Sequence, residues 1–182
     1  PLPMGAGAPE VHLSLQRRAA WAAEAPLLVV DLQPGARCVL HESHERIDGP
    51  AVAQNLQVHV RLGEGAVLDH VRVAAPGPQD SMAHHVHVRL ARGARYAQCL
   101  LASGSAYHLQ RNVFELQGDG ASARAGGVLL AAGSALEQQV LARHAAPRTR
   151  SVADVLALAS GAARMVANAH THIAAGSDDA DT

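Results

Sequence analysis

The stretch Val58–Ala66 reads Val-His-Val-Arg-Leu-Gly-Glu-Gly-Ala, and close relatives of it recur before and after it in the chain. Each copy ends on a Gly-Ala pair that begins at Gly35, Gly65, Gly93 or Gly120, so the copies are 30, 28 and 27 residues apart. Within a copy, apolar residues alternate with other residues, which predicts an extended strand with one apolar face rather than a helix. A repeat at this period predicts a stacked architecture.

Each repeat also holds a second strand-like run after its Gly-Ala pair, such as Val67–Val73, and then a turn such as Ala75-Pro76-Gly77-Pro78. Two strands and two turns per repeat make one coil. The fold class predicted is therefore all-β, a parallel β-helix with about two strands per coil. The glycine before each Ala suits a turn position with positive φ, which only glycine adopts cheaply.

Alignment of the coils on their Gly-Ala pairs predicts which side chains stack on one another. The predicted inward columns are Leu28, Val58, Val86 and Asn112; Val30, Val60, Val88 and Phe114; and Leu32, Leu62, Leu90 and Leu116. The opposite face should pair Asp31 with Arg61, and Arg89 with Glu115, on coils about 4.8 Å apart. Such exposed ion pairs are each worth roughly 0 to 1 kcal/mol.

Composition limits the classes of function. With 182 residues and 48% hydrophobic residues the chain can form one domain with a core, but at 2% aromatic residues that core must consist of Ala, Val and Leu. A net charge of -1 argues against a nucleic-acid partner. No run approaches the roughly 18 apolar residues of a membrane span. Two cysteines without a Cys-x-x-Cys spacing, and a start unlike a signal peptide, favour a cytoplasmic location.

The chain divides into an N-terminal segment, residues 1–26, and a β-helix over residues 27–182. The Ala-rich run Leu15–Glu24 predicts a short helix that Pro26 ends. Ser151–Leu158 has no clean alternation, so a helix is an open alternative there. Beyond Gly161, residues 164–168 and 171–173 are predicted to form two shorter strands.

Several segments, in order and spacing, resemble the core of the SufB/SufD family of iron-sulfur cluster assembly proteins, with SufD the nearer of the two. The resemblance covers about residues 27–181, and Glu42 resembles a glutamate that follows an early coil of the family. It rests on the Gly-Ala coils, Gln110–Asn112, Leu116–Ala121, His144–Pro147 with Ser151, and Gly161–Asn168.

This resemblance implies a right-handed parallel β-helix that acts as a non-catalytic scaffold. It implies a SufB-like β-helix partner and the ATPase SufC, with a homodimer as an alternative to the heterodimer. It also implies that no cofactor is bound stably, because the family builds its iron-sulfur cluster transiently at a subunit interface.

The sequence departs from the family near its end. Of the family's Phe-Asn-Gly strand and Ala-Gln-Lys-Thr-Asp run, only Asn168 and Asp181 match. The family's later cysteine-bearing strand and the C-terminal helices that dock the ATPase are expected to be missing. The chain is thus either the β-helix core of a SufD-like protein or a diverged relative without assembly activity.

Twelve histidines raise the possibility of a metal site. His170 and His172 share one strand face in the region that the resemblance links to assembly, and they are the predicted metal ligands. His85 and His87 should share a face, with His87 stacked beside His59, although ordinary surface histidines explain that column better. Both Cys38 and Cys99 are predicted to be buried packing residues.

The alternative function is a β-helix enzyme that acts on polysaccharides, because parallel β-helices also host lyases and hydrolases. Fold alone does not decide between the two functions. Saccharide-active β-helices usually line a cleft with aromatic residues and clustered charges, whereas this sequence has few aromatic residues and isolated charge pairs. The scaffold function is therefore favoured.

Overall fold

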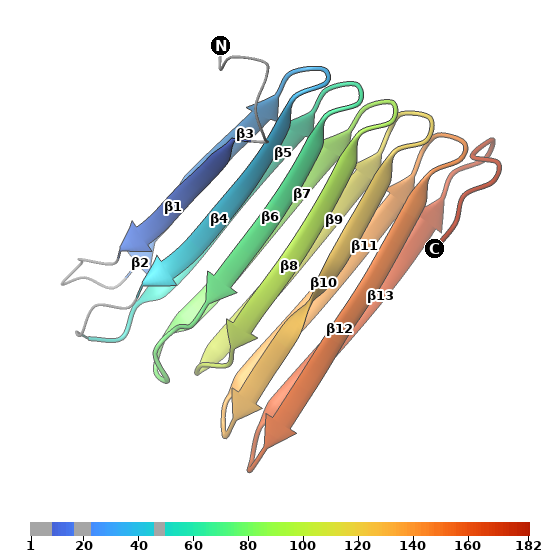
Figure 1. Ribbon diagram of the computed structural model, residues 1–182. Coiled ribbons are helices and arrows are strands. Elements are labelled where there is room, and N and C mark those ends of the chain that lie inside the picture. Colours follow the sequence, from blue (N-terminus) through green and yellow to red (C-terminus); the bar gives the residue numbers. More distant parts are fainter. Residues whose placement is uncertain (1–8, 17–22, 46–49) are drawn as a thin grey trace.

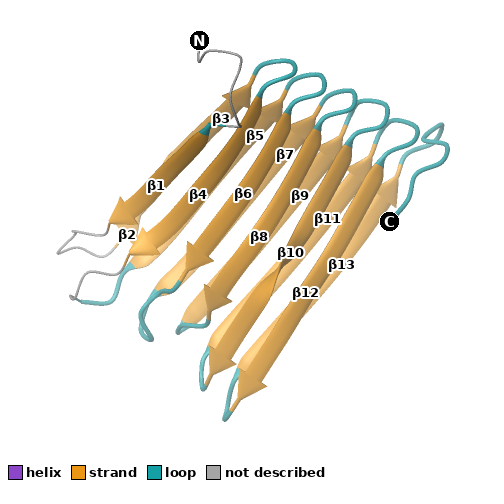
Figure 2. Cartoon of the chain, in the orientation of Figure 1, coloured by secondary structure: helices purple, strands orange, loops and turns teal. Residues whose placement is uncertain are grey.

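A computed structural model describes residues 9–16, 23–45 and 50–182 of the chain, and in these residues it contains strands and turns but no helix (Figure 2). The strands form two parallel sheets that lie face to face, and the chain passes from one sheet to the other at every turn (Figure 1). Each coil therefore contributes one strand to each sheet, and the predicted parallel β-helix with about two strands per coil is confirmed.

The first sheet has six strands, and strands that are neighbours in the sheet belong to successive coils of the chain. In spatial order they are β1 (Glu10–Gln16), β4 (Arg37–Glu45), β6 (Val67–Ala74), β8 (Arg95–Ser103), β10 (Ser122–Ala132) and β12 (Arg150–Ser160). Parallel neighbours need a crossover connection, and here the chain forms a strand of the second sheet before it returns to the first.

The second sheet has the same parallel order. Its strands are β2 (Ala23–Glu24) and β3 (Leu27–Leu32), which both pair with β5 (Ala53–Leu62), followed by β7 (Ser81–Leu90), β9 (Tyr107–Leu116), β11 (Ala135–His144) and β13 (Arg164–Ile173). None of the described residues forms a helix long and apolar enough to cross a membrane.

The predicted register is confirmed throughout the predicted columns. Val58 is the pairing partner of Leu28 and Val86, and Val88 is the partner of Val60 and Phe114. The outward partners are also as predicted: Asp31 pairs with Arg61, and Arg89 with Glu115. The Gly-Ala pattern thus sets both which residues stack and which face they occupy.

The turn after each strand of the second sheet explains the Gly-Ala repeat. Gly35, Gly65, Gly93 and Gly120 all have φ between 62° and 71°, a region that L side chains rarely adopt. In the next coil Arg148 stands in this position with φ 53°. The residue that follows each glycine from Gly65 to Gly120 is a fully buried alanine, so the small side chain lets the turn close onto the core.

The N-terminal segment differs from the prediction. Residues 17–22, where most of the expected helix falls, lie outside the described residues, but both flanks of that run are in strands, at the end of β1 and in β2. Because β1 pairs with β4 over its full length, the stacked strands begin before residue 27. Alternation of His12, Leu13, Ser14 and Leu15 is the signal for this strand.

The last coil also corrects two expectations. Ser151–Leu158, for which a helix was left open, lies in strand β12, because β10 offers it a complete parallel partner. The two short strands expected after Gly161 are one continuous strand, β13, paired with β11 along its length. A single parallel bridge between Asp181 and Arg150, the first residue of β12, adds a further pairing to the first sheet.

We predict losses of stability of very different size for substitutions at two adjacent residues of β7. Val88 is fully buried in the core, so Val88→Asp places a charge without a partner there and should destabilise the protein by several kcal/mol. The Arg89 side chain is 59% exposed, so Arg89→Ala should cost under about 1 kcal/mol. Urea unfolding of the two variants measures both, and equal effects would contradict the register.

Candidate functional site

Polar side chains gather inside the solenoid toward the side opposite the Gly-Ala turns, near the ends of the first-sheet strands and the starts of the second-sheet strands. Buried apolar residues such as Ala74, Met82 and Ala102 lie beyond them on the same side. We name the polar group the interior polar network: Glu42, His44, Gln54, His70, Arg72, His84, Tyr96, Gln98, His108 and Gln110. All occupy inward positions of β4 to β9, so alternation along the strands puts them inside.

A buried ion pair lies at the centre of the network. Arg72 Nε and Nη2 both donate to Glu42 Oε1, at 3.2 and 3.1 Å, and each residue is only 1% exposed. Burial acts to raise the pKa of the Glu42 carboxyl, but the Arg72 charge and hydrogen bonds from His44 and His70 outweigh it and hold that pKa well below its usual range. The pair is therefore ionised at neutral pH.

His70 connects the ion pair to an aromatic residue. Its Nε2 lies 3.1 Å from Glu42 Oε2 and its Nδ1 lies 3.0 Å from the Tyr96 hydroxyl. Burial lowers the pKa of His70, and the hydrogen bond to Glu42 offsets part of that shift. The Tyr96 hydroxyl in turn donates its single proton to Gln98 Oε1 at 3.1 Å, which extends the network along β8.

A second branch runs from Arg72 through Gln110 to two more histidines. Arg72 Nη1 donates to Gln110 Oε1 at 3.1 Å, and Gln110 Nε2 lies 2.9 Å from His84 Nδ1 and 2.7 Å from His108 Nε2. His108 Nδ1 donates to the Ser103 carbonyl at 2.6 Å. Since Gln110 is the donor to both rings, each ring must accept at that nitrogen, which requires both to be neutral.

The electrostatic surroundings agree with neutral rings. Burial lowers the pKa of His108 to about 4, with its bond to the Ser103 carbonyl acting in the opposite direction. Burial also lowers the pKa of His84 well below its ordinary value, and the charges of His44 and Arg72 act in the same direction. The network therefore contains one fixed ion pair, and burial favours the neutral forms of His84 and His108.

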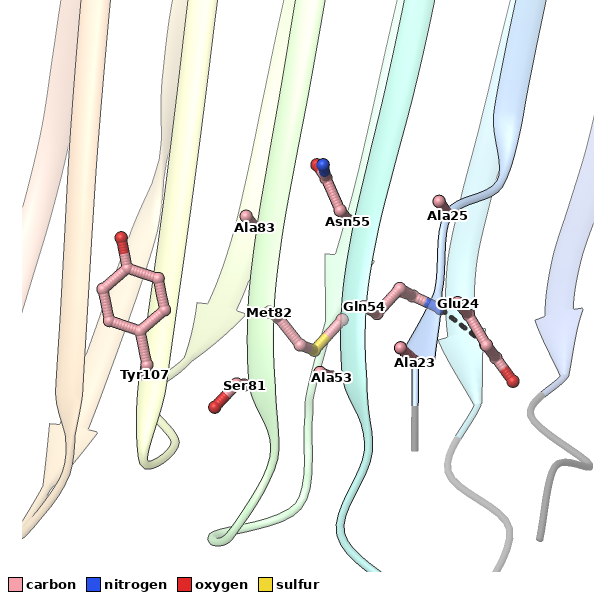
Figure 3. Close-up of a pocket in the computed structure, with 10 residues that line it drawn as sticks. All are labelled: Ala23, Glu24, Ala25, Ala53, Gln54, Asn55, Ser81, Met82, Ala83 and Tyr107. Carbon is pink, nitrogen blue, oxygen red and sulfur yellow. Dashed lines mark hydrogen bonds between the residues drawn. The ribbon is translucent and has the colours of Figure 1, made fainter. Parts of the chain in front are cut away.

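The network reaches the surface at a shallow pocket between the starts of β2, β5, β7 and β9 (Figure 3). Gln54 forms this connection, because its Nε2 donates to Glu24 Oε2 at 3.3 Å while its Oε1 accepts from His84 Nε2 at 3.2 Å. Met82 and Tyr107 also line the pocket. The hydrogen bonds of Gln54 thus link the buried imidazole of His84 to a side chain at the pocket.

The His144–Pro147 segment, which contributed to the family resemblance, has a structural role. His144 points inward at the end of β11, with Nδ1 2.8 Å from Thr149 Oγ1 and Nε2 2.9 Å from Ser151 Oγ. Ser177 Oγ donates to the His144 carbonyl at 3.1 Å. These contacts fix the turn that carries Arg148, so Ser151 stabilises this turn rather than lining an open site.

The outward histidine column is arranged as predicted, with the rings of His59 and His87 edge to face at 5.8 Å. His87 Nε2 lies 3.1 Å from Glu115 Oε1, and the guanidinium groups of Arg89 and Arg143 contact the same carboxylate at 3.3 and 3.5 Å. Burial acts to raise the pKa of Glu115, but His87 and both arginines lower it overall. This positive surrounding makes the column a poor place for a cation.

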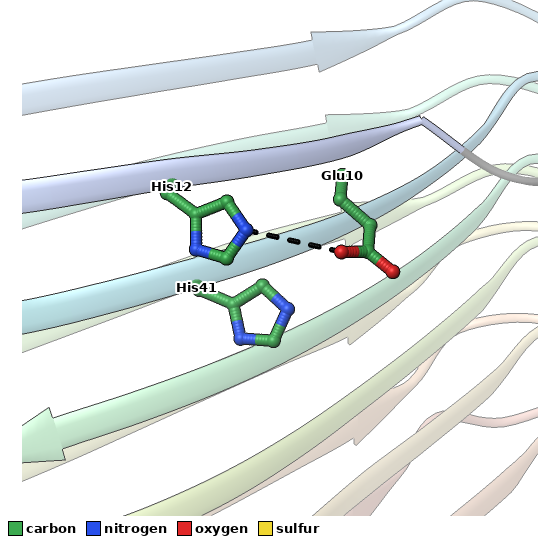
Figure 4. A group of neighbouring side chains, drawn as sticks. All are labelled: Glu10, His12 and His41. Carbon is green, nitrogen blue, oxygen red and sulfur yellow. Dashed lines mark ion pairs between the residues drawn. The ribbon is translucent and has the colours of Figure 1, made fainter.

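His170 and His172, the predicted metal ligands, both lie on the outward face of β13, beside Leu141 and Arg143 of β11. In the part of the chain that the structure describes, one group of three or more His, Cys, Asp or Glu side chains lies close enough to hold a metal ion, and it does not include them. That group is Glu10, His12 and His41 (Figure 4). Metal binding by His170 and His172 stays a prediction.

The two cysteines have different environments. Cys38 is buried in the core as predicted, and burial raises the pKa of its thiol. For Cys99 the prediction was wrong: it is exposed, because Tyr96, Gln98 and Leu100 take the inward positions of β8. Cys99 therefore lies on the outer face of the first sheet.

Two parallel sheets coiled around a shared core, with a polar network inside it, define this chain as a parallel β-solenoid protein. The family model described as "SUF system FeS cluster assembly, SufBD core domain" matches residues 15–182. The chain therefore belongs to this family, and it is involved in iron-sulfur cluster assembly. The search of curated proteins gave no match, and neither did the search of solved structures.

Sequence reasoning placed His84 within the densest histidine group but did not find the interior polar network. A signal was present, because Glu42, His70, Arg72 and His84 all fall in phase with the inward apolar positions of their own strands. Polar residues at core positions of several successive coils indicate a shared interior network, since isolated buried polar groups are costly.

We predict strong coupling between Glu42 and Arg72. Arg72→Met should destabilise the protein by about 3 to 5 kcal/mol, because it leaves a buried carboxylate without its main partner. The double variant Glu42→Gln with Arg72→Met should cost less than the sum of the two single variants. Urea unfolding of the full cycle provides the coupling energy. The matched control is the exposed Arg89–Glu115 pair, whose coupling should stay under about 1 kcal/mol.

The buried histidines predict a loss of stability in mild acid. Between pH 6.5 and 4 the unfolded chain protonates His108 while the folded protein does not, so stability falls as pH falls, by up to about 3 kcal/mol from this residue. The depressed pKa of Glu42 acts in the same direction below about pH 4.3. Urea midpoints at pH 7 and pH 5 measure the effect, and His108→Gln should reduce it. A flat profile would contradict the buried positions.

Proposed function

We propose that this chain is a SufD-like, non-catalytic scaffold subunit of the cytoplasmic SUF iron-sulfur cluster assembly system, which pairs with a SufB-like subunit and the ATPase SufC. The observation that carries the proposal is the SufBD core domain match over residues 15–182, which spans nearly all of the solenoid. The choice of SufD over SufB rests on the sequence resemblance of segments such as Gln110–Asn112 and Gly161–Asn168.

The positions of the thiols support a scaffold that does not hold a cluster alone. Iron-sulfur clusters are anchored mainly by thiolates. Cys38 faces the core from β4, whereas Cys99 faces outward from β8, so the two sulfur atoms lie on opposite faces of the first sheet. They do not converge on one site. The cluster is then cargo, held at an interface to which a partner contributes ligands.

The non-catalytic assignment is supported by the ion pairs that the outward acidic side chains form. The outward acids Glu64, Asp119 and Asp154 pair with arginines one coil away. Tyr96 is buried, and Tyr107 is the exposed aromatic residue in the described part of the chain. A polysaccharide-active site would need aromatic residues and unpaired acids together, so nothing here favours that alternative.

We predict that this chain co-purifies with a SufB-like subunit and SufC when the three are co-expressed. Failure of the chain to capture either protein would contradict the proposed function.

A second test concerns iron. The isolated chain, purified anaerobically, should contain less than stoichiometric iron and show no cluster absorption in the visible range, because its thiols do not converge. Elemental analysis and a visible spectrum measure this. A stoichiometric cluster on this chain alone would contradict its assignment as a scaffold that shares its cargo with a partner.

A further inference from the structure

Three metal-binding side chains gather at the other end of the solenoid from β13, on the outer face of the first sheet. Glu10 and His12 lie on the edge strand β1, and His41 lies on its neighbour β4 (Figure 4). Each offers one ligand atom, and these atoms all lie within 4.8 Å of one another. Glu10 and His12 are two residues apart on one strand face, which is why both point the same way.

The geometry of the group is set by the parallel pairing of the two strands. His12 and His41 are direct pairing partners, and their rings stack with centroids 4.5 Å apart and planes 5° from parallel. His12 Nε2 lies 3.8 Å from Glu10 Oε2. Zinc ligands lie about 2.0 to 2.2 Å from the metal, so small rotations of exposed side chains are enough to close the group around an ion.

We propose that Glu10, His12 and His41 form a binding site for a divalent transition-metal ion such as Zn²⁺. Two imidazoles and one carboxylate are the donor set of many zinc sites, and water completes the coordination in such three-residue sites. The position is separate from His170 and His172 and from the interior polar network. The site does not depend on the proposed scaffold function.

The electrostatic surroundings favour a cation here and not at the other outward histidine pair. On this face Val39 is the pairing partner of Glu10 and Val71 is that of His41, and neither carries a charge. Asp69, the partner of Val39 on β6, adds a negative charge nearby. Arg37 lies on the same face of β4, four residues before His41, which is about 13 Å along the strand.

The His59–His87 pair offers the contrast. Its neighbouring carboxylate, Glu115, is already shared with Arg89 and Arg143. A cation there would meet two guanidinium groups, and the carboxylate that it needs is engaged. Both pairs consist of outward imidazoles, but two arginines lie near the His59–His87 pair. The His59–His87 pair is therefore a matched control for the pair of His12 and His41.

Binding at this site would hold two neighbouring strands together. β1 pairs with β4 over its full length, and both strands contribute side chains to the site. An ion shared by β1 and β4 adds a cross-link between the two strands. The free energy of binding then contributes directly to keeping β1 on the sheet, because the site exists only when the strands are paired.

The test is a titration of the full chain, purified without a histidine tag, with Co²⁺ as a spectroscopic probe and Zn²⁺ as competitor. One ion per chain should bind, and Zn²⁺ should displace it. His41→Ala and Glu10→Gln should each weaken Co²⁺ binding by at least about tenfold, which is 1.4 kcal/mol. His59→Ala should leave binding unchanged. Circular dichroism checks that each variant keeps its strands.

A second readout is independent of the spectrum. Zn²⁺ should raise the melting temperature of the unmodified chain and of His59→Ala, but not that of His41→Ala, since a ligand of the folded state stabilises it. Amide exchange in β1 should slow in the same samples. Equal loss of affinity in His41→Ala and His59→Ala, or no change in either, would overturn the site by showing scattered surface binding.

Discussion

The parallel pairing of each strand with the strand one coil earlier is the constraint on which the structure depends. It places every residue about 4.8 Å from its counterpart, on the same face, so a whole column is either inside or outside. The column of Val58 and Val86 is apolar for this reason, and Asp31 meets Arg61 on the outside for the same reason. The glycine turns keep the columns aligned, because each returns the chain to the first sheet at an equivalent position.

The same constraint makes a buried charge possible. Glu42 and Arg72 are pairing partners on β4 and β6, and both face inward, so stacking itself brings the carboxylate to the guanidinium. The next coils supply His84, His108 and Gln110 as further partners. A buried ion pair is weak evidence for stability, but it penalises misalignment strongly. A slip of one residue would turn Arg72 outward and leave Glu42 unpaired inside, so the network favours one register.

Much of this architecture could be predicted from the sequence, because the Gly-Ala repeat and period-two alternation are local signals. The coils, the inward columns and the Arg89–Glu115 neighbours follow from them. Strand β12 did not, since its inward residues are mostly small and its outward Leu156 and Leu158 blur the alternation. Pairing with β10 decides its structure, and tertiary context of this kind is invisible in a short window.

The interior polar network and the exposure of Cys99 were missed for a related reason. General tendencies describe histidine as intermediate in burial and free cysteine as among the most buried residues. Phase within the strand overrides both tendencies, since His84 lies two residues before the inward Val86, and Cys99 lies between the inward Gln98 and Leu100. The group of Glu10, His12 and His41 needed β1, a strand that the sequence segmentation had placed outside the solenoid.

The central claim is that strand phase within stacked coils carries specific histidines into the interior, where they remain neutral. Two-bond proton–nitrogen NMR of the imidazole rings tests it most directly, because it reports the protonation and tautomer of each ring. The account predicts that His84 and His108 keep the spectrum of neutral rings at pH 5.5, with the proton of His108 on Nδ1. Titration of either ring near pH 6.5, the value of a solvent-exposed imidazole, would contradict the account.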